Sequence, residues 1–159
     1  MKTKIHLTAA SLAVLTILTF FASTVLVEVF GGSEAIAAVK RLIVYGLVIL
    51  VPAIAVTGIT GFLLAKSRSG RLVESKKKRM PFIAANGLIV LAPSAVVLDR
   101  LASAGNFSAT FTAVQSIELL AGGANLVLMF LNLRDGLRLT GRLGPGAALD
   151  PDAQKPRTG

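Results

Sequence analysis

Polar residues recur at helical spacing in the last apolar stretch of the chain, residues 107–133. Intervals of three and four residues place side chains on one face of an α-helix. A carboxylate within a membrane-spanning helix is costly unless the protein pairs it, and such groups often carry protons or bind ions. Glu118 is therefore the first candidate for chemistry. The stripe consists of Gln115, Glu118, Gly122, Asn125, Met129 and Asn132.

Counting residues inward from the basic segments predicts which polar side chains share a depth in the bundle. Asn125 falls level with Asn86 of the preceding apolar run. Glu118, about 14 residues deep or roughly 21 Å, falls near Pro52 of the second run. We expect a buried polar layer of Glu118 and Gln115 near the middle of the membrane, and another of Asn86 and Asn125.

Two interpretations of Glu118 stay open. Proline has no N–H group, so Pro52 and Pro93 each leave a backbone carbonyl free one turn earlier. In the structural interpretation, a protonated Glu118 donates a hydrogen bond to such a carbonyl, at Val48 or Ile89. In the functional interpretation, Glu118 accepts a proton or a cation, or binds a ligand, inside a cavity.

The remaining reactive residue types are few. The chain has one histidine, His6, and no cysteine. Disulfides, thiolate nucleophiles and thiolate metal sites are therefore excluded. A lone histidine at a membrane boundary is most often a solvated flank, and its alternative role is haem ligation. We expect no catalytic cluster and no metal site.

Four apolar runs provide the elements that position these residues. The chain of 159 residues is 53% hydrophobic, with a mean hydropathy of +0.73. About 20 apolar residues in a helix span the hydrocarbon core of a bilayer. The runs predict helices over about 7–30, 42–65, 81–100 and 107–133, joined by short connections. We expect an all-α membrane fold, an antiparallel bundle of four transmembrane helices.

The fourth helix is expected to continue as an amphipathic segment to about residue 143. Residues 1–143 would then form the transmembrane domain, and the Pro- and Gly-rich residues 144–159 a disordered tail.

The net charge of +9 follows the predicted topology. Of the 17 lysines and arginines, 14 flank the two chain ends and the segment between the second and third helices. Because cytoplasmic loops are enriched in Lys and Arg, both termini are expected in the cytoplasm of a bacterium, with the helices in its inner membrane. This pattern argues against nucleic acid as a partner. The three other cations are Lys40, Arg41 and Arg100.

Four consecutive cations precede the third helix, and they predict contact with anionic lipid headgroups. They are Lys76, Lys77, Lys78 and Arg79.

Three short pieces of the chain share a pattern with a known family. The pieces are Lys4-x-His6, then Pro52-Ala53 with Thr57 and Gly61, and a basic residue before the third helix, Lys78 or Arg79. Together they resemble the HemJ type of small four-helix inner-membrane proteins, the bacterial protoporphyrinogen oxidases. The resemblance implies that His6 ligates haem b and that a nearby cation contacts tetrapyrrole carboxylates. The fourth helix differs, because it lacks the family's arginine–asparagine–glutamate signature.

The sequence thus favours a non-catalytic integral membrane protein, a scaffold or accessory subunit. Its polar face would pack internally, against another membrane protein or against a second copy of the chain. The alternatives are a haem- or tetrapyrrole-linked oxidoreductase that uses His6, and proton-coupled transport through Glu118.

Overall fold

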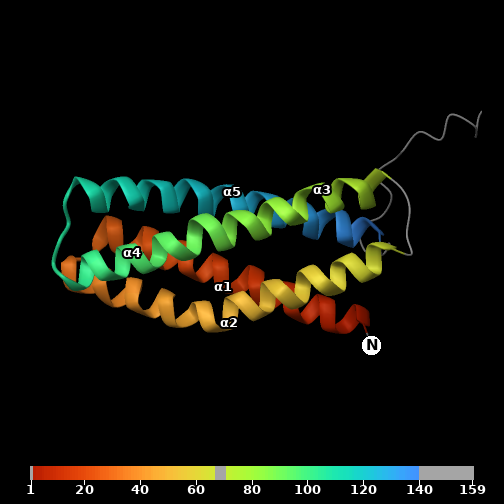
Figure 1. The fold of residues 1–159 in the computed structure, drawn as a ribbon, viewed down its shortest axis with the longest axis horizontal. Helices are drawn as coiled ribbons and strands as arrows, with labels where there is room; N and C mark the ends of the chain where they lie inside the picture. The colour runs from red at the N-terminus through yellow and green to blue at the C-terminus, as the bar shows by residue number, and fades with distance from the viewer. Residues whose placement is uncertain (1, 67–70, 140–159) are drawn as a thin grey trace, which may run out of the picture.

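The computed structural model describes residues 2–66 and 71–139, with side chains over 4–64 and 78–138. These residues form helices and short turns (Figure 1). Within this described part, four helical stretches are long and apolar enough to cross a membrane, which confirms the all-α prediction. The elements are α1 (Lys2–Phe30), α2 (Ser33–Lys66), α3 (Arg71–Ala85), the π-helix η1 (Asn86–Leu91), α4 (Ala92–Ser103) and α5 (Ala109–Leu139).

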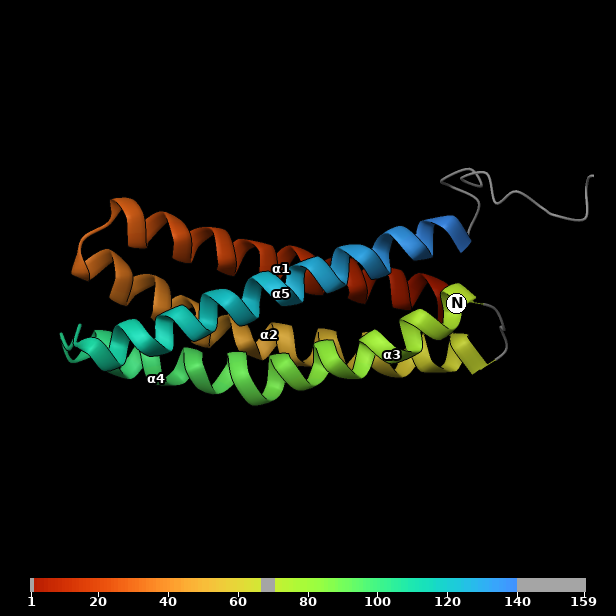
Figure 2. The ribbon, with the colours of Figure 1, turned by 90° about the horizontal axis from the view of Figure 1, so that it is seen from above.

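Consecutive helices run antiparallel and close into a four-membered bundle (Figures 1 and 2). α1 packs along α2 and against α5, while α4 packs against both α2 and α5. We call the end with the connections Gly31–Gly32 and 104–108 the turn end. The start of α1 and the end of α5 lie together at the opposite end, here the terminal end.

The second helix begins earlier than expected. α2 starts at Ser33 rather than near residue 42, and its 34 residues extend about 51 Å. Glu34 in the first turn interacts favourably with the helix dipole. The alanine-rich residues that follow are strong helix formers. Lys40, expected in an outer connection, consequently lies inside a helix.

The third membrane segment also begins earlier than expected. α3 starts at Arg71, so the four consecutive cations lie on a helix and Pro81 lies inside it. The segment widens into η1 immediately before α4, whose second residue is Pro93. Proline lacks the N–H that an α-helix would use there, and single π-turns often absorb such a break. The predicted irregularity at Pro93 therefore takes the form of a π-turn.

Small residues let the helices approach closely. Ala13 and Ala53 are buried with Ile17, Leu50 and Leu126 in the core of the bundle. Small side chains at helix contacts are typical of membrane bundles, which have no hydrophobic drive between their helices. A second cluster near the turn end combines Leu98, Ala102 and Phe111. The end of the predicted amphipathic segment, 140–143, and the predicted tail, 144–159, lie outside the described part.

Candidate functional site

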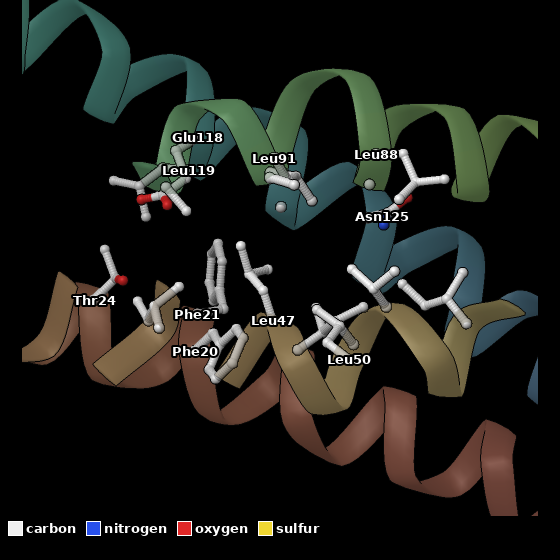
Figure 3. Close-up of a pocket in the computed structure, with 18 residues that line it drawn as sticks. Phe20, Phe21, Thr24, Leu47, Leu50, Leu88, Leu91, Glu118, Leu119 and Asn125 are labelled. Carbon is white, nitrogen blue, oxygen red and sulfur yellow. The ribbon is translucent and has the colours of Figure 1, made fainter. Parts of the chain in front are cut away.

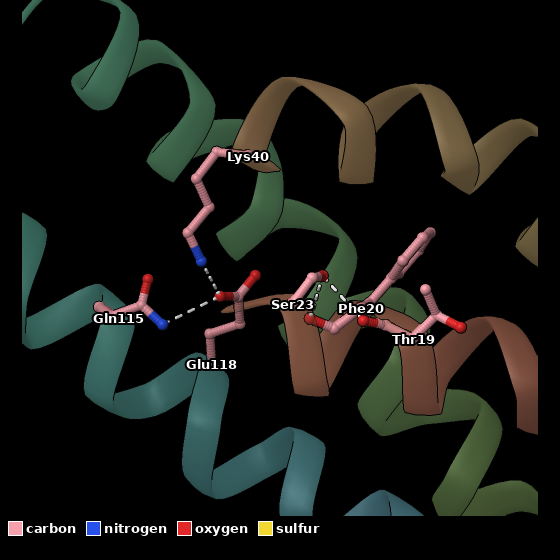
Figure 4. Close-up of polar contacts among 6 residues, drawn as sticks. All are labelled: Thr19, Phe20, Ser23, Lys40, Gln115 and Glu118. Carbon is pink, nitrogen blue, oxygen red and sulfur yellow. Dashed lines mark hydrogen bonds and ion pairs between the residues drawn. The ribbon is translucent and has the colours of Figure 1, made fainter. Parts of the chain in front are cut away.

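A cluster of ionisable and polar side chains lies inside the bundle near the turn end. The Lys40 Nζ of α2 lies 2.5 Å from Glu118 Oε2 of α5. Gln115 Nε2, one turn earlier on α5, donates to the same oxygen at 3.2 Å. Figure 4 shows both contacts converging on one oxygen of Glu118. We call Glu28, Lys40, Gln115 and Glu118 the ion cluster.

Burial makes this ion pair structurally important. Lys40 is 0% exposed and the Glu118 side chain is 12% exposed. Moving two charges out of water is costly, and removing one partner of such a pair leaves the other unpaired. The early start of α2 is what brings Lys40 to the level of Glu118.

Glu28 completes the cluster from the end of α1. Its Oε1 is buried and has no hydrogen-bond partner among the described residues. It interacts electrostatically with both Lys40 and Glu118. The cluster thus joins three helices and contains two acidic groups for one ammonium.

The environment of Glu118 differs from the sequence expectation. The depth count places it level with Pro52 near mid-membrane, and the structural interpretation makes it a donor to a freed carbonyl. The structure instead makes it an acceptor for Lys40, which lies on the second turn of α2. The count is wrong because it takes the terminal-end limits of the apolar runs as level, whereas the Lys40–Glu118 contact shows that α2 and α5 are offset along the bundle.

A second feature is the central pocket, a hollow among all four helical segments (Figure 3). Glu118 lines the pocket near the turn end and Asn125 lines it two turns further along α5. Asn125 is 0% exposed, yet neither its Nδ2 nor its Oδ1 has a hydrogen-bond partner among the described residues. The rest of the wall is mostly apolar and includes Phe21, Leu47 and Leu91.

Asn86 and Asn125 lie close to one level, although no hydrogen bond links their side chains in the described structure. Gly87, the neighbour of Asn86, comes close to Asn125, because a Cβ atom placed on that glycine would lie 3.9 Å from Asn125 Nδ2. Asn86 Nδ2 instead donates to the backbone carbonyl of Ala121 at 2.9 Å. Asn86 therefore ties η1 to α5, while Asn125 is left facing the pocket.

The basic residues near the terminal end divide into two kinds. Arg79 Nη1 donates to Asp135 Oδ2 of α5 at 2.8 Å, and Asp135 is 2% exposed. Arg79 is thus engaged in an ion pair between helices. Lys78 is exposed, whereas the side chains of Lys76 and Lys77 lie outside the described residues.

His6 lies half-buried near the terminal end. Its Nδ1 is 3.0 Å from Thr60 Oγ1, and its ring approaches Gly61 together with the thioether of Met80. His6 does not line the central pocket. It also does not line the groove between α1 and α2 that runs from Lys4 to Val56. In the described structure His6 thus contacts α2 through Thr60, and it lies outside the walls of these two cavities.

Sequence reasoning misses the residues that pair with the acidic groups. The charge pattern identifies Lys40 only as an outer cation, and no pattern singles out Asp135. The rule that ionisable groups inside a membrane pair with one another could have found Lys40, because few cations lie toward the turn end.

The described residues contain no group of three His, Asp or Glu side chains arranged to hold a metal ion. Comparisons with protein-family models, with curated proteins and with solved structures found no match for the chain.

Proposed function

We propose that this chain is a small integral protein of a bacterial inner membrane that acts as a non-catalytic scaffold or accessory subunit. The observation that carries the proposal is the internal pairing of Glu118. Its Oε2 accepts from Lys40 and Gln115 of the same chain, so the costly carboxylate is used to join helices. The arginine–aspartate pair between α3 and α5 does the same near the terminal end.

The proposed topology places both chain ends in the cytoplasm. Its support is the distribution of cations along the sequence, because 14 of the 17 lie near the two chain ends or in the segment between the second and third membrane helices. Because the chain has no cysteine, single cysteines can be introduced directly. A membrane-impermeant maleimide added outside the cell should label Gly32→Cys in intact cells and Lys78→Cys only after permeabilisation. The reverse pattern would overturn the orientation.

The accessory role requires a protein partner in the membrane. The bundle exposes large apolar side chains on every membrane segment, including Leu18, Tyr45, Ile89 and Leu120. A photoreactive residue at each of these four positions tests the faces in turn, with buried Leu98 as the matched control. A cross-linked band of discrete mass, from one position and not from Leu98, is expected. Cross-links to lipid alone at all four positions would contradict the role.

Proton-coupled transport through Glu118 is the second candidate. It is favoured by one observation, that Glu118 lines a pocket together with Asn125, whose amide atoms have no hydrogen-bond partner among the described residues. In proteoliposomes, Glu118→Gln should then abolish a proton flux that is preserved in Glu34→Gln, at an exposed glutamate on the first turn of α2. Equal flux in wild type and Glu118→Gln would remove this candidate.

The haem-linked oxidoreductase rests on the sequence resemblance at His6 alone. An absorption spectrum of the purified protein after haem supplementation tests it. A Soret band that is lost in His6→Ala would support it, and the absence of any band in wild type would eliminate it.

A further inference from the structure

The central pocket carries an inference beyond the proposed function. We propose that it is a binding site for water, occupied by a short file of molecules that connects Asn125 with the Lys40–Glu118 ion pair.

The first argument is the state of Asn125. A side-chain amide offers two donors and an acceptor with two lone pairs. Asn125 is fully buried, and none of these is used by the described protein atoms. Buried polar groups in folded proteins are nearly always hydrogen-bonded to protein or to ordered water. Asn125 is among the residues that line the hollow (Figure 3).

The second argument is size. The pocket leaves about 60 Å³ for the centres of water molecules. One water needs roughly 10–15 Å³ of such space, so the pocket has room for about four to six. Glu118 and Asn125 are two helical turns apart, or about 10 Å along α5. Three or four waters at hydrogen-bonding separation, about 2.8 Å, cover that length.

The third argument is the polar group at the other end. A buried water needs two to four polar partners, and a purely apolar cavity stays dry. The Glu118 carboxylate lines the pocket, and so does buried Thr24 of α1 (Figure 3). The walls between these ends include apolar leucine and phenylalanine side chains, so waters there would hydrogen-bond to one another and to the polar groups at the two ends.

The π-turn provides the space. Gly87, Leu88 and Leu91 of η1 all line the pocket. A π-turn widens the helix, and such turns are frequent at functional sites. Gly87 has no side chain, and Asn125 lies close to the position that a Cβ atom would occupy there.

Water-edited solid-state NMR of the full chain in bilayers of deuterated lipid tests the proposal. Polarisation transferred from water should reach the Asn125 amide and the Leu91 methyl groups. Leu98, which is 0% exposed and does not line the pocket, is the matched dry control. The near-isosteric Asn125→Leu should reduce the water signal at Leu91 to the level of Leu98. The control Asn132→Leu, which lies outside the pocket wall, should leave the water signal at Leu91 unchanged.

Two results would overturn the proposal. One is a wild-type spectrum in which Leu91 receives no more water signal than Leu98. The other is a Leu91 signal that arises from lipid chains, detected with protonated lipid, because a lipid tail would then occupy the pocket. The wild-type measurement decides the question even if Asn125→Leu fails to fold. Neither result bears on the accessory role.

Discussion

Breaking the Lys40–Glu118 pair should destabilise the bundle far more than replacing both partners. Lys40→Met and Glu118→Gln keep the approximate shape of each side chain while removing its charge. At 2.5 Å the pair has a Coulomb energy of about 7 kcal/mol at an effective dielectric constant of 20. Desolvation offsets much of that attraction. Removing one partner of a buried pair typically costs about 3–5 kcal/mol, because the other charge stays buried and unpaired.

We therefore expect each single substitution to reduce the free energy of unfolding by about 3 kcal/mol or more. The double variant should lose much less than the sum, with a coupling energy of about 2 kcal/mol or more. Unfolding by sodium dodecyl sulfate in bicelles, followed by pulse proteolysis, measures these energies. Lys78→Met, at an exposed lysine, is the control and should change stability by less than about 0.5 kcal/mol.

The reasoning would be refuted by single substitutions that each cost less than about 1 kcal/mol, or by costs that add within about 0.5 kcal/mol. Either result would mean that the pair does not hold α2 to α5. Glu28→Gln distinguishes the pair from the rest of the cluster, since the buried Oε1 of Glu28 has no hydrogen-bond partner in the described structure. Its effect should be clearly smaller.

Three further perturbations follow from the helix contacts. Gly46→Ala places a Cβ atom against the Phe20 ring, closer than van der Waals contact allows. This overpacking should reduce the free energy of unfolding by about 1–3 kcal/mol in the same assay. An unchanged unfolding midpoint would show that α1 and α2 are not tightly packed there. Asp99→Asn breaks a half-exposed ion pair with Arg41 and should reduce the free energy of unfolding by less than about 1 kcal/mol. This loss should disappear in 1 M salt. A loss that does not depend on salt would contradict an electrostatic origin. Asp135→Asn should reduce the free energy of unfolding by about 1–3 kcal/mol, because the 2% exposed carboxylate loses its charge-assisted hydrogen bond from Arg79. A variant as stable as the wild type would indicate that packing alone holds α3 to α5.

The four helices were predictable because their signal is local. Each apolar run is long enough to span a bilayer, and hydropathy depends only on residues within the run. The start of α2 was not predictable in this way, since Ser33–Arg41 mixes charged residues with alanines and only two larger apolar residues, so it does not lengthen the apolar run. A helix extends past its apolar part whenever capping and helix propensity favour it, as at Glu34 and the alanines that follow.

The ion cluster depends on tertiary structure and was only half predictable. The polar stripe of α5 was visible from spacing, and Asn125 does lie close to the level of Asn86 through its approach to Gly87. The partner of Glu118 required the axial offset between helices. That offset depends on where α2 begins and on the π-turn before Pro93, and neither follows from the periodicity of α5.

The distance in sequence between the ion-pair partners has a consequence for biosynthesis. Lys40 and Glu118 are 78 residues apart. At a synthesis rate of roughly 5–20 residues per second, Lys40 is made about 4–16 s before its partner. During that interval the first hairpin, α1 with α2, carries a lysine without the carboxylate of α5. Within that hairpin the acidic group near Lys40 is Glu28 of α1. The ion cluster is therefore completed only once α5 has been synthesised.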